Sequence, residues 1–239
     1  MQQPTILRVP ALPTPHGFET RRGTLVDDPL RPMVRLRQVH GSEVLLIDSS
    51  TEMAPFRSTR VDDRPACDAL ITRRRDVTLA IATADCLPAL AFDATTGSIG
   101  AAHAGWRGVA LGVLPAMMGS MAREFGTEPG NCDVALGPCI GAGVYRVAED
   151  VVTSFRAAGL PSTVFGEPRD EANAEGNPQR TWLCDLVGAA TFQLRACGVD
   201  ASRVHASRRC TFSEPDDFHS YRRDGDAAGR MLSGIALPT

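Results

Sequence analysis

Three side chains that can bind a metal ion or attack a substrate lie at the ends of predicted strands. They are His40, Cys86 and His103. The predicted strands that precede them cover residues 34–39, 77–84 and 98–102. Because loops that leave a rigid sheet often direct their side chains at one point, we expect these three groups to converge.

Three interpretations of this trio are open from the residue types alone. Two imidazoles and one thiolate suit zinc, and three protein ligands leave a fourth position free for water or substrate. Alternatively, His103 takes a proton from Cys86, and the thiolate attacks an acyl carbon. In the third interpretation, Cys86 behaves as a small buried apolar residue, and the histidines have only a structural role. The long, unequal spacings match no short metal-binding motif.

Arginines near these residues are candidates for binding an anion. Arg107 lies in a Gly-Trp-Arg-Gly sequence, and Arg21 and Arg222 are each followed by a second arginine. The planar guanidinium matches the oxygens of phosphate or carboxylate, although each arginine is also suited to an ordinary solvated surface. Asp68 and Asp85 are candidates to orient a metal-bound histidine, and a turn or capping role suits them equally.

The pattern of apolar residues predicts a mixed arrangement of helices and strands. Predicted strands cover 34–39, 43–48, 77–84, 87–92, 98–102, 132–136 and 204–210, and predicted helices cover 109–125, 147–158 and 183–197. Gly41-Ser42 predicts a bend or tight hairpin, and residues 161–181 predict a long loop. Because helices and strands do not strictly alternate, we expect an α+β fold of layered sheets and helices, in a single domain over 1–239.

Composition excludes several classes of function. The chain has 239 residues, a net charge of −3 and 5% aromatic residues, so it lacks the basic, aromatic-rich surface of a nucleic-acid-binding protein. No apolar run is long enough to span a membrane, and the N-terminus does not resemble a signal peptide. Seven scattered cysteines do not form a disulfide framework, so we expect a cytoplasmic protein with reduced thiols.

Short motifs distributed along nearly the whole chain resemble one known family. They are RQVHG, CDALIT, TADCLP, AAHAGWRG, LGPCIG, LCDL, QLRACGV and SYRRDG, in that order. Together they resemble the YfiH-type family, also called the laccase-domain or polyphenol-oxidase family and the peptidoglycan editing factor family. The resemblance extends from about residue 16 to 235.

The resemblance implies a fold, a cofactor and an activity. The fold is a single α/β/β/α layered sandwich of mixed sheets flanked by helices. The metal ligands and catalytic residues are His40, Cys86 and His103, holding zinc, with copper possible in vitro. The activity is phosphorolysis of the purine nucleosides adenosine, inosine, guanosine and methylthioadenosine, with adenosine deamination alongside. The partners are then a purine nucleoside and phosphate, and Arg21, Arg107 and Arg222 are suited to bind the phosphate.

Two other activities follow from the family's names. A metal- or cysteine-dependent amide hydrolase acting on peptidoglycan precursors is the main alternative. Copper-dependent phenol oxidation fits poorly, because five histidines are too few for several copper centres. The chain also departs from the family pattern after Arg21, where Arg22-Gly23-Thr24 replaces a glycine pair and a following stretch is missing. We therefore expect one wall of the substrate pocket to differ. The oligomeric state and the general acid for the leaving base do not follow from the sequence.

Overall fold

Two mixed β-sheets and a small antiparallel sheet form the framework of the computed structural model, which describes residues 6–25, 31–172 and 176–238. The six-stranded sheet has the order β12-β8-β6-β7-β4-β3, the four-stranded sheet β1-β13-β5-β2, and the small sheet β10-β11-β9. The strands are β1 (His16–Phe18), β2 (Met33–Val34), β3 (Val44–Ile47), β4 (Ala69–Thr72), β5 (Thr78–Thr83), β6 (Leu87–Asp93), β7 (Ser98–Ala104), β8 (Cys132–Leu136), β9 (Arg146–Val147), β10 (Arg169–Ala172), β11 (Pro178–Leu183), β12 (Val204–Ala206) and β13 (Met231–Ile235). The helices are α1 (Ala54–Arg57), α2 (Trp106–Ala110), α3 (Val113–Phe125), α4 (Glu149–Ala157), α5 (Leu186–Ala196) and α6 (Tyr221–Asp224).

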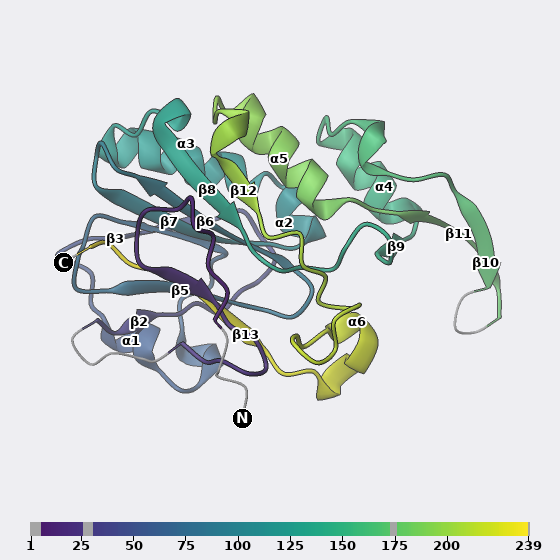
Figure 1. Ribbon diagram of the computed structural model, residues 1–239, viewed down its shortest axis with the longest axis horizontal. Helices are drawn as coiled ribbons and strands as arrows, with labels where there is room; N and C mark the ends of the chain where they lie inside the picture. Colours follow the sequence, from purple (N-terminus) through teal and green to yellow (C-terminus); the bar gives the residue numbers. More distant parts are fainter. Residues whose placement is uncertain (1–5, 26–30, 173–175, 239) are drawn as a thin grey trace.

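The two larger sheets pack face to face, and helices cover the outer face of the six-stranded sheet (Figure 1). Every residue of β6 and β7 is buried, as expected for strands covered on both faces. One apolar core lies between this sheet and the helices, where Met117 and Met121 of α3 contact β7 at Gly100. A second core, which includes Phe18, lies between the two sheets. This architecture confirms the predicted α+β layers, although in the described part of the chain α1, with four residues, is the only α-helix beyond the four-stranded sheet.

The predicted helices are present, but their boundaries differ. The predicted helix 109–125 is two helices, α2 and α3, separated at Gly112, whose φ of 80° is left-handed. The predicted helices 147–158 and 183–197 begin two to three residues later, as α4 and α5. The first residues of α2 directly follow the end of β7, and the break at Gly112 lets α3 begin as a separate helix.

Several predicted strands differ from the structure. The strand predicted over 98–102 extends to Ala104, so His103 lies within β7, opposite Pro88, and does not follow its end. The strand over 34–39 is reduced to β2, and the strand over 204–210 is reduced to β12. Of the two predictions for Gly41-Ser42, the bend is confirmed at His40-Gly41, and the hairpin is wrong because β2 and β3 belong to different sheets.

The loop predicted over 161–181 is also wrong. It contains the antiparallel hairpin β10–β11, in which Arg169 lies opposite Thr181. The hairpin projects beyond the body of the molecule (Figure 1), and its residues are mostly exposed. Because most of the hairpin is exposed and only the end of β11, at Thr181 and Trp182, packs on a core, its sequence lacks the alternating apolar pattern by which a strand is predicted.

No helix among the described residues has the length and apolar character needed to cross a lipid bilayer.

Candidate metal centre

The side chains of His40, Cys86 and His103 meet at one place. Their potential ligand atoms all lie within 4.8 Å of one another. The two imidazole rings are edge-on, with centroids 4.8 Å apart and an interplanar angle of 75°. His103 is buried, Cys86 is partly buried and His40 is exposed, so the group opens to solvent on the side of His40. Metal ligands with one open side suit an ion that also binds a substrate or water.

Asp68 holds His40 and His103 in place. Its carboxylate is fully buried and faces His103 Nδ1 at 2.8 Å. It also accepts hydrogen bonds from the backbone N–H groups of Val39 (3.1 Å), His40 (3.0 Å) and Gly41 (2.7 Å). These bonds stabilise His40 in a left-handed conformation with φ 61°. Because the carboxylate binds Nδ1 of His103, Nε2 of that ring is left to face a metal ion, which is the arrangement typical of metal-binding histidines.

The ionisation of the site follows from these contacts. Burial raises the pKa of Cys86, but hydrogen bonds from His103 and His40 outweigh it and bring the pKa to about 6. Burial lowers the pKa of His103, but Asp68 and Cys86 outweigh it and raise the pKa to about 9. Burial also opposes the charge on Asp68, yet its hydrogen bonds hold the pKa of that carboxyl below its ordinary value. At neutral pH these pKa values favour a thiolate beside an imidazolium, and an ion bound here would displace the imidazolium proton.

Gly105 lets the first turn of α2 approach the three side chains. A Cβ atom at this position would lie 2.9 Å from Cys86 Sγ and 3.2 Å from His40 Cδ2. No side chain fits there without displacing a ligand. The chain then continues directly into Trp106 and the exposed Arg107, whose guanidinium carbon lies 4.4 Å from the Trp106 ring centroid.

Asp85 connects the cysteine to the C-terminal part of the chain. Its buried carboxylate accepts hydrogen bonds from Thr211 Oγ1 (2.5 Å), Ser220 Oγ (3.0 Å) and the backbone N–H of Arg222 (2.7 Å). Asp85 therefore does not orient a histidine, which was one of its two predicted roles. It instead fixes the start of α6 beside the residue that precedes Cys86, in a backbone conformation with φ 88°.

Two of the three predicted anion-binding arginines line one hollow of about 410 Å³. Arg107 enters it from α2, and Arg222 enters from α6, where its Nη1 donates to the carbonyl of Arg146 at 2.8 Å. The Arg222 guanidinium lies 5.3 Å from the ring centroid of Tyr145, which also lines the hollow. The three candidate metal ligands are not part of the lining, but Gly105 lies next to Trp106 and Arg107 in the chain, and Asp85 binds the backbone of Arg222.

The third predicted arginine lies elsewhere. Arg21 is exposed and pairs with Asp224 of α6 at 3.3 Å, and it does not line the hollow. The sequence analysis did not identify Tyr145 or Arg146. Neither belongs to a motif with a recognised chemical role, and only the fold brings them beside Arg222. Glu171 of the projecting hairpin also lines the hollow, where its carboxylate pairs with Arg146 at 3.1 Å.

Comparison with known proteins agrees with this arrangement of motifs. The family model described as multi-copper polyphenol oxidoreductase laccase matches residues 19–238. This chain belongs to that family. A purine nucleoside phosphorylase of Deinococcus radiodurans is 36% identical over 264 residues, covering 98% of this chain and 93% of that protein. An adenosine deaminase, RL5, from an unknown prokaryotic organism is 32% identical over 219 residues, covering 89% of this chain and 76% of that protein.

Solved structures of the laccase-family fold are similar over the whole chain. YfiH of Bacillus licheniformis superposes with a TM-score of 0.84 at 25% identity, covering 99% of this chain and 98% of that one. YlmD of Geobacillus stearothermophilus gives a TM-score of 0.82 at 28% identity, covering 100% and 98%. Both similarities confirm the family resemblance of the motifs and the mixed α+β fold.

The residues of this laccase-family member fit a single metal ion better than several. Within 6–25, 31–172 and 176–238, one group of His, Cys, Asp or Glu side chains is arranged to hold an ion, and it is the trio at His40. The ring nitrogens of His16 are occupied by Thr14 and Val9. Several copper centres require more free imidazoles than these. Two histidines and a cysteine are a donor set typical of mononuclear zinc.

Proposed function

We propose that this protein is a zinc-dependent purine nucleoside phosphorylase with adenosine deaminase side activity. The substrates are adenosine, inosine, guanosine and methylthioadenosine, together with phosphate. The single observation that carries the proposal is the convergence of His40, Cys86 and His103 near a hollow lined by three arginines, Arg107 and Arg222 among them. The names of the relatives favour this reaction over the hydrolysis of cell-wall amides.

Each side chain of the site has a separate role in this proposal. His40, Cys86 and His103 hold the ion, and Asp68 fixes the orientation of His103. When bound, zinc supplies a Lewis acid that lowers the pKa of a water molecule at its open position, which is the chemistry that deamination requires. Arg107 provides a positive charge at the hollow for an anion, which is the chemistry that phosphorolysis requires.

Arg222 supplies the second charge, and its position is fixed independently of the anion. Its backbone N–H binds Asp85, its Nη1 binds a carbonyl oxygen, and its guanidinium lies against the Tyr145 ring. A guanidinium held at two points, on a residue whose backbone is also fixed, loses little freedom when it binds phosphate, so its contribution to affinity is larger. We therefore assign phosphate binding to Arg107 and Arg222, with Arg21 as an outer positive charge.

The test combines metal content with phosphate-dependent release of hypoxanthine from inosine. About one zinc ion per chain and release that requires phosphate are expected for the wild type. Cys86→Ala is expected to lose both while remaining folded by circular dichroism. Cys197→Ala is the matched control, because that thiol lies at the end of α5 outside the trio. Zinc binding without release of base would contradict the proposed reaction, and a metal-free wild type would contradict the zinc site.

The arginine assignment has a separate test. Removing a charge-assisted hydrogen bond to an anion costs about 1.5–3 kcal/mol. Arg222→Ala is therefore expected to raise the KM for phosphate by about tenfold or more, while its backbone bond to Asp85 is retained. Arg156→Ala, on the exposed face of α4, is the control. An unchanged KM for phosphate in Arg222→Ala would exclude this residue from phosphate binding.

A further inference from the structure

Two cysteines outside the metal centre lie directly opposite each other. The Cys139 N–H donates to the carbonyl of Arg209 at 3.4 Å, and the Thr211 N–H donates to the carbonyl of Cys139 at 3.0 Å. Cys139 and Cys210 are thus partners in a parallel bridge. Partners in adjacent extended segments have Cα atoms about 4.8 Å apart. That separation falls within the range of about 4.4–6.8 Å that a disulfide requires.

The Cys210 sulfur is surrounded by hydrogen-bond donors. The backbone N–H groups of Gly141 and Ser213 donate to it at 3.2 and 3.4 Å, and Ser213 Oγ lies 3.3 Å away. Gly141 makes room for the sulfur, because a Cβ there would lie only 3.2 Å from it. Partial burial raises the pKa of Cys210, but these hydrogen bonds outweigh it and lower the pKa below its ordinary value. The thiolate is the reactive form of a cysteine.

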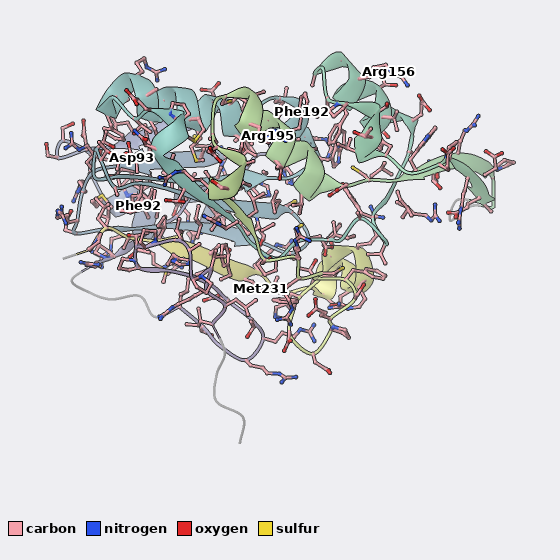
Figure 2. The ribbon with its side chains drawn as sticks, turned by 45° about the horizontal axis from the view of Figure 1, so that its top comes forward. Phe92, Asp93, Arg156, Phe192, Arg195 and Met231 are labelled. Carbon is pink, nitrogen blue, oxygen red and sulfur yellow. The ribbon has the colours of Figure 1, made fainter. Side chains whose placement is uncertain are left out.

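Both cysteines line the same cavity, which has a volume of about 1480 Å³. Phe192 and Arg195, which lie on α5 in Figure 2, form part of its wall. Cys210 is partly exposed to it, whereas Cys139 is 2% exposed. A small oxidant therefore reaches Cys210 first, and Cys139 is the nearest thiol that can react with the product.

We propose that Cys210 and Cys139 form a modification site for hydroperoxides, with Cys210 as the reacting thiolate and Cys139 as the resolving thiol. The Cys210 thiolate attacks one oxygen of hydrogen peroxide, the O–O bond breaks, and hydroxide leaves as Cys210 becomes a sulfenic acid. The Cys139 thiol then attacks the Cys210 sulfur, an S–S bond forms, and water leaves. The two sulfurs together lose two electrons, which reduce the peroxide to water.

The two cysteines are connected to the metal centre through Asp85. Ile140, which follows Cys139, donates its N–H to the Asp85 carbonyl at 2.9 Å. Thr211, which follows Cys210, donates its hydroxyl to the Asp85 carboxylate. A disulfide would therefore link the two segments that hold the residue before Cys86.

The test is peptide mapping of the reduced, metal-loaded full chain after exposure to hydrogen peroxide. The remaining thiols are alkylated with N-ethylmaleimide, and the chain is digested without reductant. We expect a Cys139–Cys210 cross-linked peptide pair, lighter by the two hydrogen atoms lost and cleaved by dithiothreitol. Fragmentation separates Cys139 from Cys132, which lies nearby in the sequence. This readout is independent of the proposed phosphorylase activity.

Variants give the controls. Cys210→Ser is expected to abolish the cross-link completely, and Cys197→Ser to leave it unchanged. Cys139→Ala is expected to leave Cys210 as a sulfenic or sulfinic acid; if this buried variant does not fold, the wild type and Cys210→Ser decide. Oxidation of wild-type Cys210 to a sulfinic acid without a cross-link would overturn the proposal. Modification of Cys197 with no reaction at Cys210 would overturn it as well.

Discussion

Replacing Asp68 with asparagine tests whether this buried carboxylate organises the metal centre. One oxygen receives the N–H of His40 and faces His103 Nδ1, and the other receives the N–H groups of Val39 and Gly41. Asparagine keeps one oxygen and replaces the other with an NH₂ group, which cannot accept a hydrogen bond. Whichever way the amide is oriented, two of the four donors lose their acceptor.

The expected effects follow from these two losses. A buried donor left without an acceptor costs about 1–3 kcal/mol, so Asp68→Asn is expected to lower the free energy of unfolding by about 2–6 kcal/mol. Loss of a carboxylate that orients a metal-bound histidine typically lowers metal affinity about 10–100-fold. We expect zinc affinity to fall by that factor, because either His40 and His103 lose their contacts directly, or the N–H groups on both sides of His40 lose theirs.

The assay is competition for zinc with a chromogenic chelator, together with urea unfolding of the metal-free protein. Asp133→Asn is the matched control. Asp133 also pairs with a histidine, His205, at 3.1 Å, and with Arg203 at 2.7 Å, but it lies in β8 outside the trio. It is expected to reduce stability without changing zinc affinity. Wild-type zinc affinity in folded Asp68→Asn would refute the reasoning.

Three further predictions concern reactivity, pH and packing. Alkylation of Cys86 by iodoacetamide in the metal-free protein is expected to be half-maximal near pH 6, where its pKa lies, and to be blocked by zinc; a midpoint near that of an ordinary thiol would contradict the ion pair. Burial lowers the pKa of His16, whose Nε2 accepts the Val9 N–H at 2.9 Å. Neutral His16 therefore stabilises the folded state above the ordinary histidine pKa, and this stabilisation is lost as the pH falls below that value. Urea unfolding at about pH 7.5 and about pH 5.5 should show a loss of about 0.5–1.5 kcal/mol in the wild type that is absent in His16→Phe; equal losses in both would exclude His16 as the cause. Gly137→Ala would place a Cβ 2.4 Å from a phenylalanine ring of the inter-sheet core and is expected to cost about 1–3 kcal/mol in thermal or urea unfolding, whereas Gly143→Ala, with open space around it, should be neutral. Equal stability of the two glycine variants would show that the ring moves aside.

Most of the strands that sequence could predict are runs in which nearly every residue is buried. The runs at 87–92, 98–102 and 132–136 correspond to β6, β7 and β8, because a strand enclosed by two layers needs apolar residues at nearly every position. The half-buried edge strand β3 was also predicted, from the run at 43–48. The projecting hairpin β10–β11 has no such requirement. Its strands are held by backbone pairing and by polar contacts such as that between Thr181 and Glu171, which leave no apolar pattern in the residue types.

The candidate site was predictable in its ligands but not in its surroundings. His40, Cys86 and His103 carry an unusual combination of residue types, and the structure brings them together as predicted. Tyr145 lines the neighbouring hollow because the fold brings it beside Arg222, which its local sequence does not indicate. The predicted positioning role was confirmed for Asp68, which binds His103, and was wrong for Asp85, although both aspartates lie next to a cysteine in the sequence.

The contacts of Asp68 and Asp85 show why the backbone geometry at His40 and Asp85 could not be predicted from the local sequence. His40 and Asp85 both adopt a left-handed backbone, which costs a residue with a side chain about 1–3 kcal/mol and persists only where its surroundings enforce it. Asp68 binds three successive N–H groups around His40, and the Asp85 carboxylate binds three donors from the C-terminal part of the chain. The backbone at His40 and before Cys86 is thus stabilised by contacts with residues distant in sequence. Since these contacts form only when both sheets and the C-terminal segment have assembled, we expect metal affinity to depend on the stability of the whole fold and not on the motifs alone.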